Sequence, residues 1–369
     1  MKRPTLADVA VRAGVSAKTV SNVLLGRPHV SAATRAKVQA AVEEVGYEAG
    51  HATSQAGRGL ASGRTGRIAV VVPNLYQPYF AENAERLILA LAECGFTSTL
   101  RIANGGDRER DAVLGVTTAD ADGVIICPHH LSDELLAGAA PRRPAVALGG
   151  APIKALDGVL MGEHAGFLAI TRHLLATGRR RLAFVWNGPA GAVPTGDRYL
   201  GFAAALEEHG IEHDPSLVAY SSDWDRRASG YEAMVGLLRR SGPRFDGPQF
   251  DGPQFDGPGF DGPGFDGPGF DGPGFDGAVC VNDTIAVGVL KALRAHAIRV
   301  PEDVAVTGFD DTDEGEFTIP SLSSVSPDQG EMVAAAVRLL IERLDGYDGP
   351  ARQVHTGVHL LIRDSSAQV

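Results

Sequence analysis

The sequence has little cysteine, and its few cysteines are not placed to share a site. Cys94, Cys127 and Cys280 are far apart along 369 residues and show no C-x-x-C spacing. Separated cysteines in an odd number argue against a disulfide framework and against a structural zinc site. We therefore expect a protein of a reducing compartment.

Long hydrophobic runs are lacking as well. No apolar stretch approaches the roughly 20 residues of a membrane-spanning helix. The first residues include Lys2, Arg3 and Asp8, where a secretory signal would be apolar. We expect a cytoplasmic protein that is neither exported nor embedded in a membrane.

Complete sets of metal ligands or catalytic groups are also missing from the sequence. No Ser/His/Asp or Cys/His order points to a nucleophile, so we expect neither an enzyme nor a bound cofactor or metal. Solvated loops are the favoured interpretation of two incomplete ligand groups, His129-His130 and the set Asp310, Asp311 and Asp313.

Positive charge is scarce except near the N-terminus. The formal net charge is -11, but residues 1–67 hold ten Lys and Arg against four Asp and Glu, so this segment carries +6 and the remainder −17. A basic head on an acidic body is typical of a protein that meets nucleic-acid phosphate through one module. A chance fluctuation in charge is the alternative.

Residues 5–45 have the 3.6-residue apolar period of three short helices. Thr5 begins a sequence that resembles a capping box, and Gly14 suits the left-handed stop of the first helix. Ser16 suits the N-cap of a second helix, and a third begins at Ser31. The pattern predicts a helix, a tight turn and a helix, followed by one more helix.

From Ile68 onward, short β-branched runs alternate with amphipathic helical stretches. Such alternation predicts parallel sheets built from right-handed crossovers, and the number of strands requires two sheets. The expected strands are 68–72, 123–127, 145–148, 182–186, 278–281 and 304–308. The expected helices are 82–94, 165–176, 201–210, 230–240 and 284–295.

The segment Phe245–Gly277 repeats F-D-G-P-x with a period of five residues through seven Phe-Asp-Gly units. Gly in all seven units and Pro in the first six exclude a continuous helix or a central strand. We expect an exposed, largely disordered insertion just before the strand at 278–281. A Phe-based interaction segment is one interpretation, and neutral expansion of a short repeat is the favoured one.

The motif T-L-A-D-V-A-V-R-A-G-V-S-A-K-T-V-S-N-V-L over Thr5–Leu24 resembles the DNA-binding head of LacI-family repressors. The chain from Ile68 onward resembles the periplasmic-binding-protein-like sensor of that family. The resemblance implies an all-α helix-turn-helix head and a two-lobed α/β sensor domain, with parallel sheets flanked by helices. The expected parts are a head at 1–48, a hinge at 49–67, and an effector-binding and dimerisation domain at 68–369, with lobe 1 at 68–165 and 326–346 and lobe 2 at 166–321 and 347–369.

The resemblance implies that the second helix reads DNA bases in the major groove. Lys18 can donate to guanine, Asn22 can pair with adenine, and Ala17 offers methyl contact. A solvated helix face is the alternative. The candidate phosphate contacts, which position the head without specifying sequence, are Ser16, Thr19 and Ser21, and Thr5 is a further DNA-binding candidate.

The family's hinge has the pattern P-N-x-x-A-R-x-L, which this chain matches in part. Gly57-Arg58-Gly59-Leu60 aligns with A-R-x-L, so Leu60 is the candidate minor-groove wedge and Arg58 a minor-groove or phosphate contact. Ala49-Gly50 replaces Pro-Asn, and each Gly costs about 1 kcal/mol relative to Ala in a helix. We hypothesise a hinge that orders weakly, and only on DNA.

The resemblance also implies an effector site between the two lobes. An aromatic face with carboxylate, guanidinium and amide groups suits a polyhydroxylated ligand, so a sugar is expected, although purines and other metabolites remain open. Gly149-Gly150 and Gly162-Glu163 replace two polar pairs of the family, so two contacts are expected to be missing. Loop capping is the alternative for Asp310, and ordinary core packing for Trp224. The candidate residues are Tyr76, Phe80, Arg198, Trp224, Asn282, Asp283 and Asp310.

The expected function is that of a homodimeric transcriptional regulator, most often a repressor in this family. Two-fold proteins match palindromic double-stranded operators, and a bound effector would change operator affinity. One rival is a solute-binding protein that serves a transporter, which would share the sensor fold but not the helix-turn-helix. The other is an enzyme with an α/β body, for which the sequence supplies no catalytic pair.

Overall fold

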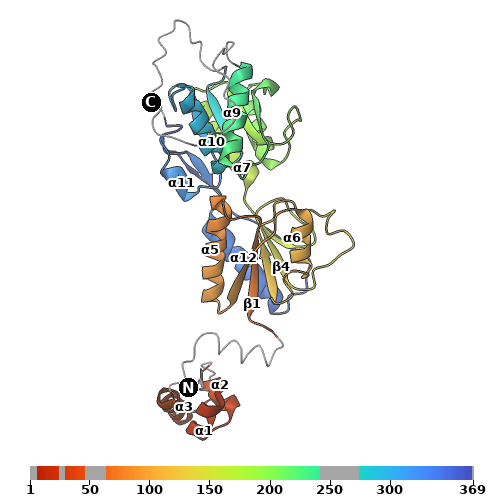
Figure 1. Ribbon diagram of the computed structural model, residues 1–369, viewed down its shortest axis with the longest axis vertical. Helices are drawn as coiled ribbons and strands as arrows, with labels where there is room; N and C mark the ends of the chain where they lie inside the picture. Colours follow the sequence, from red (N-terminus) through yellow and green to blue (C-terminus); the bar gives the residue numbers. More distant parts are fainter. Residues whose placement is uncertain (1–5, 25–29, 46–63, 242–273, 368–369) are drawn as a thin grey trace, which may run out of the picture. The chain divides into compact units, whose positions relative to one another are not determined.

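The computed structural model describes residues 6–24, 30–45, 64–241 and 274–367 of the chain (Figure 1). The chain divides into two compact units and passes between them several times. In the described ranges, no helix is long and apolar enough to cross a membrane. Unit 1 comprises Met1–Asn74, Asn83–Val159 and Val333–Val354, and unit 2 comprises Leu75–Glu82, Leu160–Met332 and His355–Val369.

These unit boundaries differ from the expected lobe boundaries by several residues, and one whole segment changes side. Leu75–Glu82 was expected in lobe 1 but belongs to unit 2. Long-range contacts explain the change: the Arg226 guanidinium lies 3.9 Å from the centroid of the Tyr76 ring, and the Asp313 backbone N–H donates to Glu82 at 3.2 Å. Pairings this distant along the chain do not leave a local pattern in the sequence.

The N-terminal head consists of three helices around a small apolar core. They are α1 (Leu6–Ala13), α2 (Ala17–Leu24) and α3 (Ala32–Val45). Val9, Val20 and Val38, one from each helix, are fully buried and pack together. The 3.6-residue apolar period therefore gives the three predicted helices a common centre.

Local hydrogen bonds set the limits of the head helices. Gly14 adopts φ +65°, a left-handed conformation that L side chains rarely take, and so allows the turn after α1. The Ser16 Oγ accepts from the Thr19 backbone N–H at 3.1 Å, and the Ser31 Oγ accepts from the Thr34 N–H at 3.2 Å. Both serines are thus N-caps, as predicted.

Unit 1 is built on a six-stranded sheet in the order β11-β5-β4-β3-β1-β2. The pairs from β2 to β5 are all parallel, as repeated strand–helix–strand crossovers require. The strands are β1 (Arg67–Val72), β2 (Thr97–Ile102), β3 (Gly123–Ile126), β4 (Ala145–Leu148), β5 (Asp157–Leu160) and β11 (Gln353–His355). The helices of this region are α5 (Pro78–Glu93), α6 (Gly106–Val113) and α12 (Gln329–Leu344).

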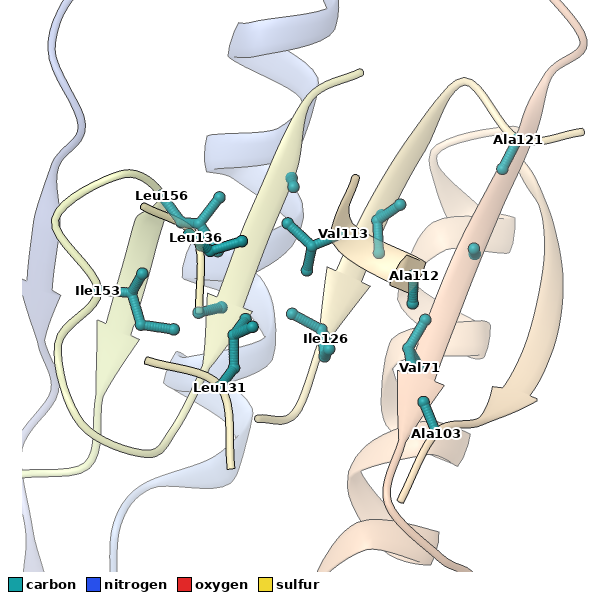
Figure 2. Close-up of a cluster of buried hydrophobic side chains, with 14 residues drawn as sticks. Val71, Ala103, Ala112, Val113, Ala121, Ile126, Leu131, Leu136, Ile153 and Leu156 are labelled. Carbon is teal, nitrogen blue, oxygen red and sulfur yellow. The ribbon is translucent and has the colours of Figure 1, made fainter. Parts of the chain in front are cut away.

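The two faces of this sheet are covered by different helices. Val71 and Ile126 belong to a buried cluster with Ala112 and Val113 of α6 (Figure 2). On the opposite face, a methyl group at Gly123 would lie 2.9 Å from Leu340 of α12. Because alternate residues of a strand point to opposite faces, central strands covered on both faces are apolar throughout.

The end of the linker is anchored to unit 1 and does not belong to a free hinge. The Asp122 carboxylate accepts from the Thr65 N–H at 2.8 Å and from the Gly66 N–H at 2.6 Å. The Arg64 guanidinium donates to the Leu344 carbonyl at the end of α12. The expected hinge boundary at residue 67 is therefore a few residues too late, and residues 46–63 lie outside the described part of the chain.

Unit 2 contains a parallel sheet in the order β7-β6-β8-β9 and an antiparallel pair, β10 and β12. The strands are β6 (Leu182–Asn187), β7 (Val218–Ser221), β8 (Gly277–Cys280), β9 (Ala305–Thr307), β10 (Ser324–Ser326) and β12 (His359–Leu361). The helices are α7 (Glu163–Ala176), α8 (Asp197–Glu208), η1 (Pro215–Leu217), α9 (Arg227–Ser241), α10 (Asp283–Ala295) and α11 (Asp313–Glu316).

The last unit of the F-D-G-P-x repeat is part of the folded structure. Phe275 is buried, and the Asp276 carboxylate accepts from the backbone N–H groups of Arg180 and Arg181 at 2.8 and 2.9 Å. Gly277 is already the first residue of β8. The expected insertion, 245–277, thus ends in four described residues, of which the last three form the final repeat unit, while 245–273 lies outside the described residues.

Candidate functional site

The exposed face of α2 carries part of the predicted DNA-reading set. Ala17 and Lys18 are exposed, while Val20 and Val23 of the same helix are buried in the head core. The helix therefore presents one apolar face inward and leaves Lys18 available for contact with another molecule. This is the amphipathic arrangement that a recognition helix needs.

Two predicted phosphate contacts also have a structural task in the head. Besides capping α2, the Ser16 hydroxyl lies 2.8 Å from the Thr19 hydroxyl, so the two side chains share a hydrogen bond. Residues Ser21 and Asn22 lie in α2, but their side chains are not described. The other DNA-binding candidates, Thr5, Arg58 and Leu60, fall outside the described residues.

In unit 2, the Arg198 side chain organises a cluster of predicted effector residues. Its guanidinium donates to the Val281 carbonyl at 2.5 Å and to the Glu163 carboxylate at 2.8 Å. The same guanidinium lies 5.3 Å from the ring centroid of Trp224 and 5.2 Å from that of Phe309. Two aromatic rings and a cation thus meet around one side chain, which cation–π attraction favours.

Asp310 adds a carboxylate to this cluster in a strained backbone conformation. Its φ is +105°, its N–H donates to the Val325 carbonyl at 3.0 Å, and its own carbonyl accepts from Gln329 at 2.7 Å. Asp310 is buried, yet no side chain or N–H of the described chain donates a hydrogen bond to its carboxylate. Burial raises the pKa of Asp310 well above its ordinary value, and the Arg198 charge opposes this rise.

Asn282 and Asp283, at the start of α10, use their side chains for hydrogen bonds within the protein. The Asn282 Oδ1 caps α10 by accepting from the Ile285 N–H at 2.9 Å, and its Nδ2 donates to the Trp224 carbonyl at 2.9 Å. The Asp283 carboxylate accepts from the Ser324 hydroxyl at 2.6 Å and from the Thr312 N–H at 2.8 Å. The Asn282 side chain therefore holds the Trp224 backbone in place, whereas the Asp283 side chain connects the start of α10 to Thr312 and Ser324.

The segment with Tyr76 and Phe80 differs in exposure from one residue to the next. Tyr76 is 39% exposed beneath the Arg226 guanidinium, whereas Phe80 is buried with its ring edge-on to Tyr79, the centroids 5.3 Å apart. The Tyr79 hydroxyl lies 3.6 Å from the Met161 sulfur. Tyr76 is therefore the more accessible aromatic of the two candidates.

Sequence reasoning missed two members of the cluster, Glu163 and Phe309. Glu163 stands in the Gly162-Glu163 pair, where a polar contact was expected to be missing, but its carboxylate pairs with Arg198. This ion pair joins residues far apart in sequence, and the expected loss of an effector contact at this pair stays a prediction. Phe309 stacks on Phe167 at 5.3 Å, and its position directly before Asp310 was the available signal.

The pair Gly149-Gly150 follows β4 in unit 1 and does not contribute side chains. Both residues have positive φ, +75° and +74°, so the backbone itself favours glycine here. A methyl group at Gly150 would lie 3.2 Å from the Pro128 carbonyl oxygen. The absence of a polar pair at this point is thus a consequence of a tight turn.

Comparison with protein families matches nearly the whole chain. The family described as bacterial regulatory proteins of the lacI family matches residues 5–49. Periplasmic binding proteins and the sugar binding domain of the LacI family match residues 65–248, and the periplasmic binding protein-like domain matches residues 171–366.

Individual relatives agree with the family matches over their full length. The chain is 31% identical to the HTH-type transcriptional regulator CelR of Thermobifida fusca, over 99% of this chain and 98% of the relative. It is also 31% identical to AscG of Escherichia coli K12, over 98% of each. A solved CelR–cellobiose complex is 30% identical, with a TM-score of 0.64 over 98% of this chain and 100% of that one. The chain therefore belongs to the LacI family of DNA-binding transcriptional regulators.

Proposed function

We propose that this LacI-family regulator is a repressor whose operator affinity is controlled by a carbohydrate bound at the Arg198 cluster of unit 2. The observation that carries the proposal is the combination of Trp224 and Phe309 with Arg198 and a buried Asp310 carboxylate that receives no hydrogen bond from the described chain. Aromatic rings cover the apolar face of a sugar, and carboxylate and guanidinium groups bind its hydroxyls. A relative has been solved with cellobiose, which supports this ligand class.

Within the site, the candidate residues divide into contacts and supports. We assign direct contact to Arg198, Trp224 and Asp310, together with the exposed ring of Tyr76. Asn282 and Asp283 act as positioning residues, because their polar atoms already bind protein groups. Phe80 shapes the site through Tyr79 rather than by stacking on the ligand.

For DNA, we propose that Lys18, Ala17 and Asn22 read bases and that Ser16, Thr19, Ser21 and Thr5 hold phosphates. Arg58 and Leu60 complete the contact in the minor groove. The exposed position of Lys18 on α2 supports this assignment. A regulator with these contacts works in the cytoplasm, where the DNA lies.

We also propose that the regulator acts as a homodimer on a palindromic operator. A single recognition helix reads few base pairs, whereas two-fold symmetry doubles the site. Unit 2 exposes apolar side chains that suit a subunit interface: Phe317 is 74% exposed and Ile319 is 81% exposed. Burial of such a patch favours association.

The test selects bound sequences from a random duplex pool with the full chain at a stated salt concentration. The selected operator is then titrated in the presence of cellobiose and a panel of other sugars and nucleosides. We expect a palindromic site whose affinity changes at least about tenfold, equivalent to 1.4 kcal/mol, with one sugar. A response to a nucleoside instead of any sugar would contradict the proposed ligand class.

A further inference from the structure

A cavity of about 380 Å³ lies in unit 1, which does not contain the Arg198 cluster. It lies at the beginning of β4 and β5, next to the end of α12. Residues of three segments, 141–145, 155–157 and 343–351, form its walls. This volume falls in the usual range for small-molecule sites.

The charged lining of this cavity is predominantly basic. Its walls include Arg142, Arg143 and Arg343, with Asp157 as the acidic member. The Asp157 side chain is 0% exposed and its charge is already compensated, because Arg343 and Arg352 lie 2.8 and 2.9 Å from its carboxylate. The carboxylate therefore does not neutralise the other arginines of the lining.

Arg142 and Arg143 are the arginines that remain available. Arg143 donates to the Ala119 carbonyl at 2.8 Å, and Arg142 is exposed. Over the described ranges, neither guanidinium forms an ion pair with a carboxylate. The nearby Asp348 is exposed and is not part of the cavity wall.

We propose that this cavity binds a small phosphorylated molecule through Arg142 and Arg143. Two guanidinium groups without carboxylate partners match the charge and the fork geometry of a phosphate group. The pocket has room for a small molecule, and contact with the DNA backbone is the alternative that the experiment tests. The site is separate from the proposed sugar site.

The position of the cavity gives such a ligand a route to the linker. Arg343 lines the cavity, and the next residue, Leu344, accepts the hydrogen bond from Arg64 at the end of the linker. Arg64 also lies 3.9 Å from Asp345. A bound phosphate that displaces the end of α12 thus changes the hydrogen bond that holds the end of the linker. This effect on the DNA-binding head rests on the function of the chain as a DNA-binding regulator.

The experiment uses the full chain and inorganic phosphate as the probe, with chloride and sulfate at matched ionic strength. We expect saturating phosphate to raise the Tm by an amount on the order of 5 °C, and the double variant Arg142→Gln/Arg143→Gln to lose this rise. The matched control Arg108→Gln/Arg239→Gln removes the same charge from exposed positions outside the cavity and should keep the rise. A parallel titration with a sugar monophosphate distinguishes a phosphate ester from free phosphate, because the preferred ligand would bind more tightly.

Two outcomes would overturn the proposal. One is a phosphate-dependent Tm rise that the Arg142→Gln/Arg143→Gln variant and the control variant either both lack or show equally. Urea midpoints must show that both variants are folded. The other is weaker operator binding by the Arg142→Gln/Arg143→Gln variant, together with a wild type in which phosphate shifts neither Tm nor operator affinity. That result would assign these arginines to contact with the DNA backbone. An operator affinity that phosphate changes at least twofold in the wild type and not in the variant would support the route through Arg64.

Discussion

Each unit buries an aspartate near an arginine, but the two carboxyl groups differ in the hydrogen bonds that they accept. Asp157 in unit 1 accepts four hydrogen bonds, from Arg343 Nε and Nη2 and from Arg352 N and Nη2, at 2.7 to 2.9 Å. Asp310 in unit 2 lies near Arg198, but within the described residues nothing donates to its carboxylate. Unit 1 thus pairs its buried carboxylate with donors of its own, whereas we propose that unit 2 leaves the Asp310 carboxyl group for the effector.

The pKa shifts follow this difference. Burial by itself would raise the pKa of Asp157, but the hydrogen bonds from Arg343 and Arg352 outweigh burial and lower it to about 2. For Asp310, burial dominates and the pKa is well above its ordinary value. A carboxylate that lacks donors in the free protein is costly, and such cost is typical of sites built for a ligand.

Among the charged positions, Asp157→Ala is expected to have the largest effect, because it leaves Arg343 and Arg352 without their shared buried partner. We expect the free energy of unfolding to fall by about 3–5 kcal/mol. Urea denaturation followed by circular dichroism measures this change. Asp348→Ala, which removes an exposed carboxylate of the same region, should cost less than about 0.5 kcal/mol. Equal losses of unfolding free energy in the two variants would contradict a stabilising role for Asp157.

Asp283 offers a second contrast, since its carboxylate in unit 2 has hydrogen-bond donors but no ion-pair partner in the described chain. Burial raises its pKa to about 7, against an ordinary value near 4. For an acid with a raised pKa, stability is complete below pH 4 and falls as the pH rises to 7, here by up to about 4 kcal/mol. Unfolding of the wild type and of Asp283→Asn across pH 4–8 measures this, and parallel curves would contradict it.

Asp157 should show the opposite pH dependence. Because its folded pKa is lowered to about 2, its contribution is complete above pH 4 and is lost as the pH falls towards 2. The expected loss is about 2 kcal/mol. The difference in unfolding free energy between the wild type and Asp157→Asn should therefore shrink in acid. A difference that stays constant from pH 5 to pH 2.5 would show that the arginines do not lower this pKa.

Local chemistry explains which parts of the fold could be predicted from the sequence. Gly14, Ser16 and the apolar period of the head act within a few residues, so turns and caps were visible in the chain. The central strands were visible because burial on both faces makes them apolar throughout. The edge strand β2, with its mixed exposure, gave no comparable signal.

The candidate site was predicted in part, and the limit again lies in distance along the chain. Arg198, Trp224 and Asp310 were proposed from a family resemblance, and the structure brings them to one cluster. The support of that cluster by Glu163 and the transfer of Leu75–Glu82 to unit 2 depend on pairings between remote segments. No periodicity within one segment encodes such pairings.

Unit 2 also accepts an insertion between α9 and β8, and its removal should have a modest, stabilising effect. The ends of the inserted stretch are close, because a methyl group at Gly274 would lie 2.9 Å from the Ser241 carbonyl oxygen. Deletion of 245–272 shortens the connection about eightfold, which favours folding by about 2 kcal/mol or less. Urea denaturation and operator binding measure the outcome.

The final repeat unit supplies the control for this deletion. Phe275→Ala should cost about 3–5 kcal/mol, because the ring is buried at the start of β8, whereas Phe270→Ala should cost nearly nothing. A deletion variant that unfolds would show that the repeat supports unit 2. Equal effects at the two phenylalanines would contradict the distinction between the last unit and the others.

Of the three buried aspartates, Asp310 is expected to give the smallest effect on stability when replaced by asparagine, together with a clear effect on function. Because the carboxylate is buried without donors in the described chain, a neutral amide of the same shape should change the free energy of unfolding by less than about 1 kcal/mol. Loss of the hydrogen bond from this carboxyl group to the effector should weaken effector binding about tenfold or more. Calorimetric titration of the effector, with operator affinity in its absence as the control, separates the two effects. A stability loss like that of Asp157→Ala would place Asp310 among the structural charges, and the two units would then use their buried aspartates alike.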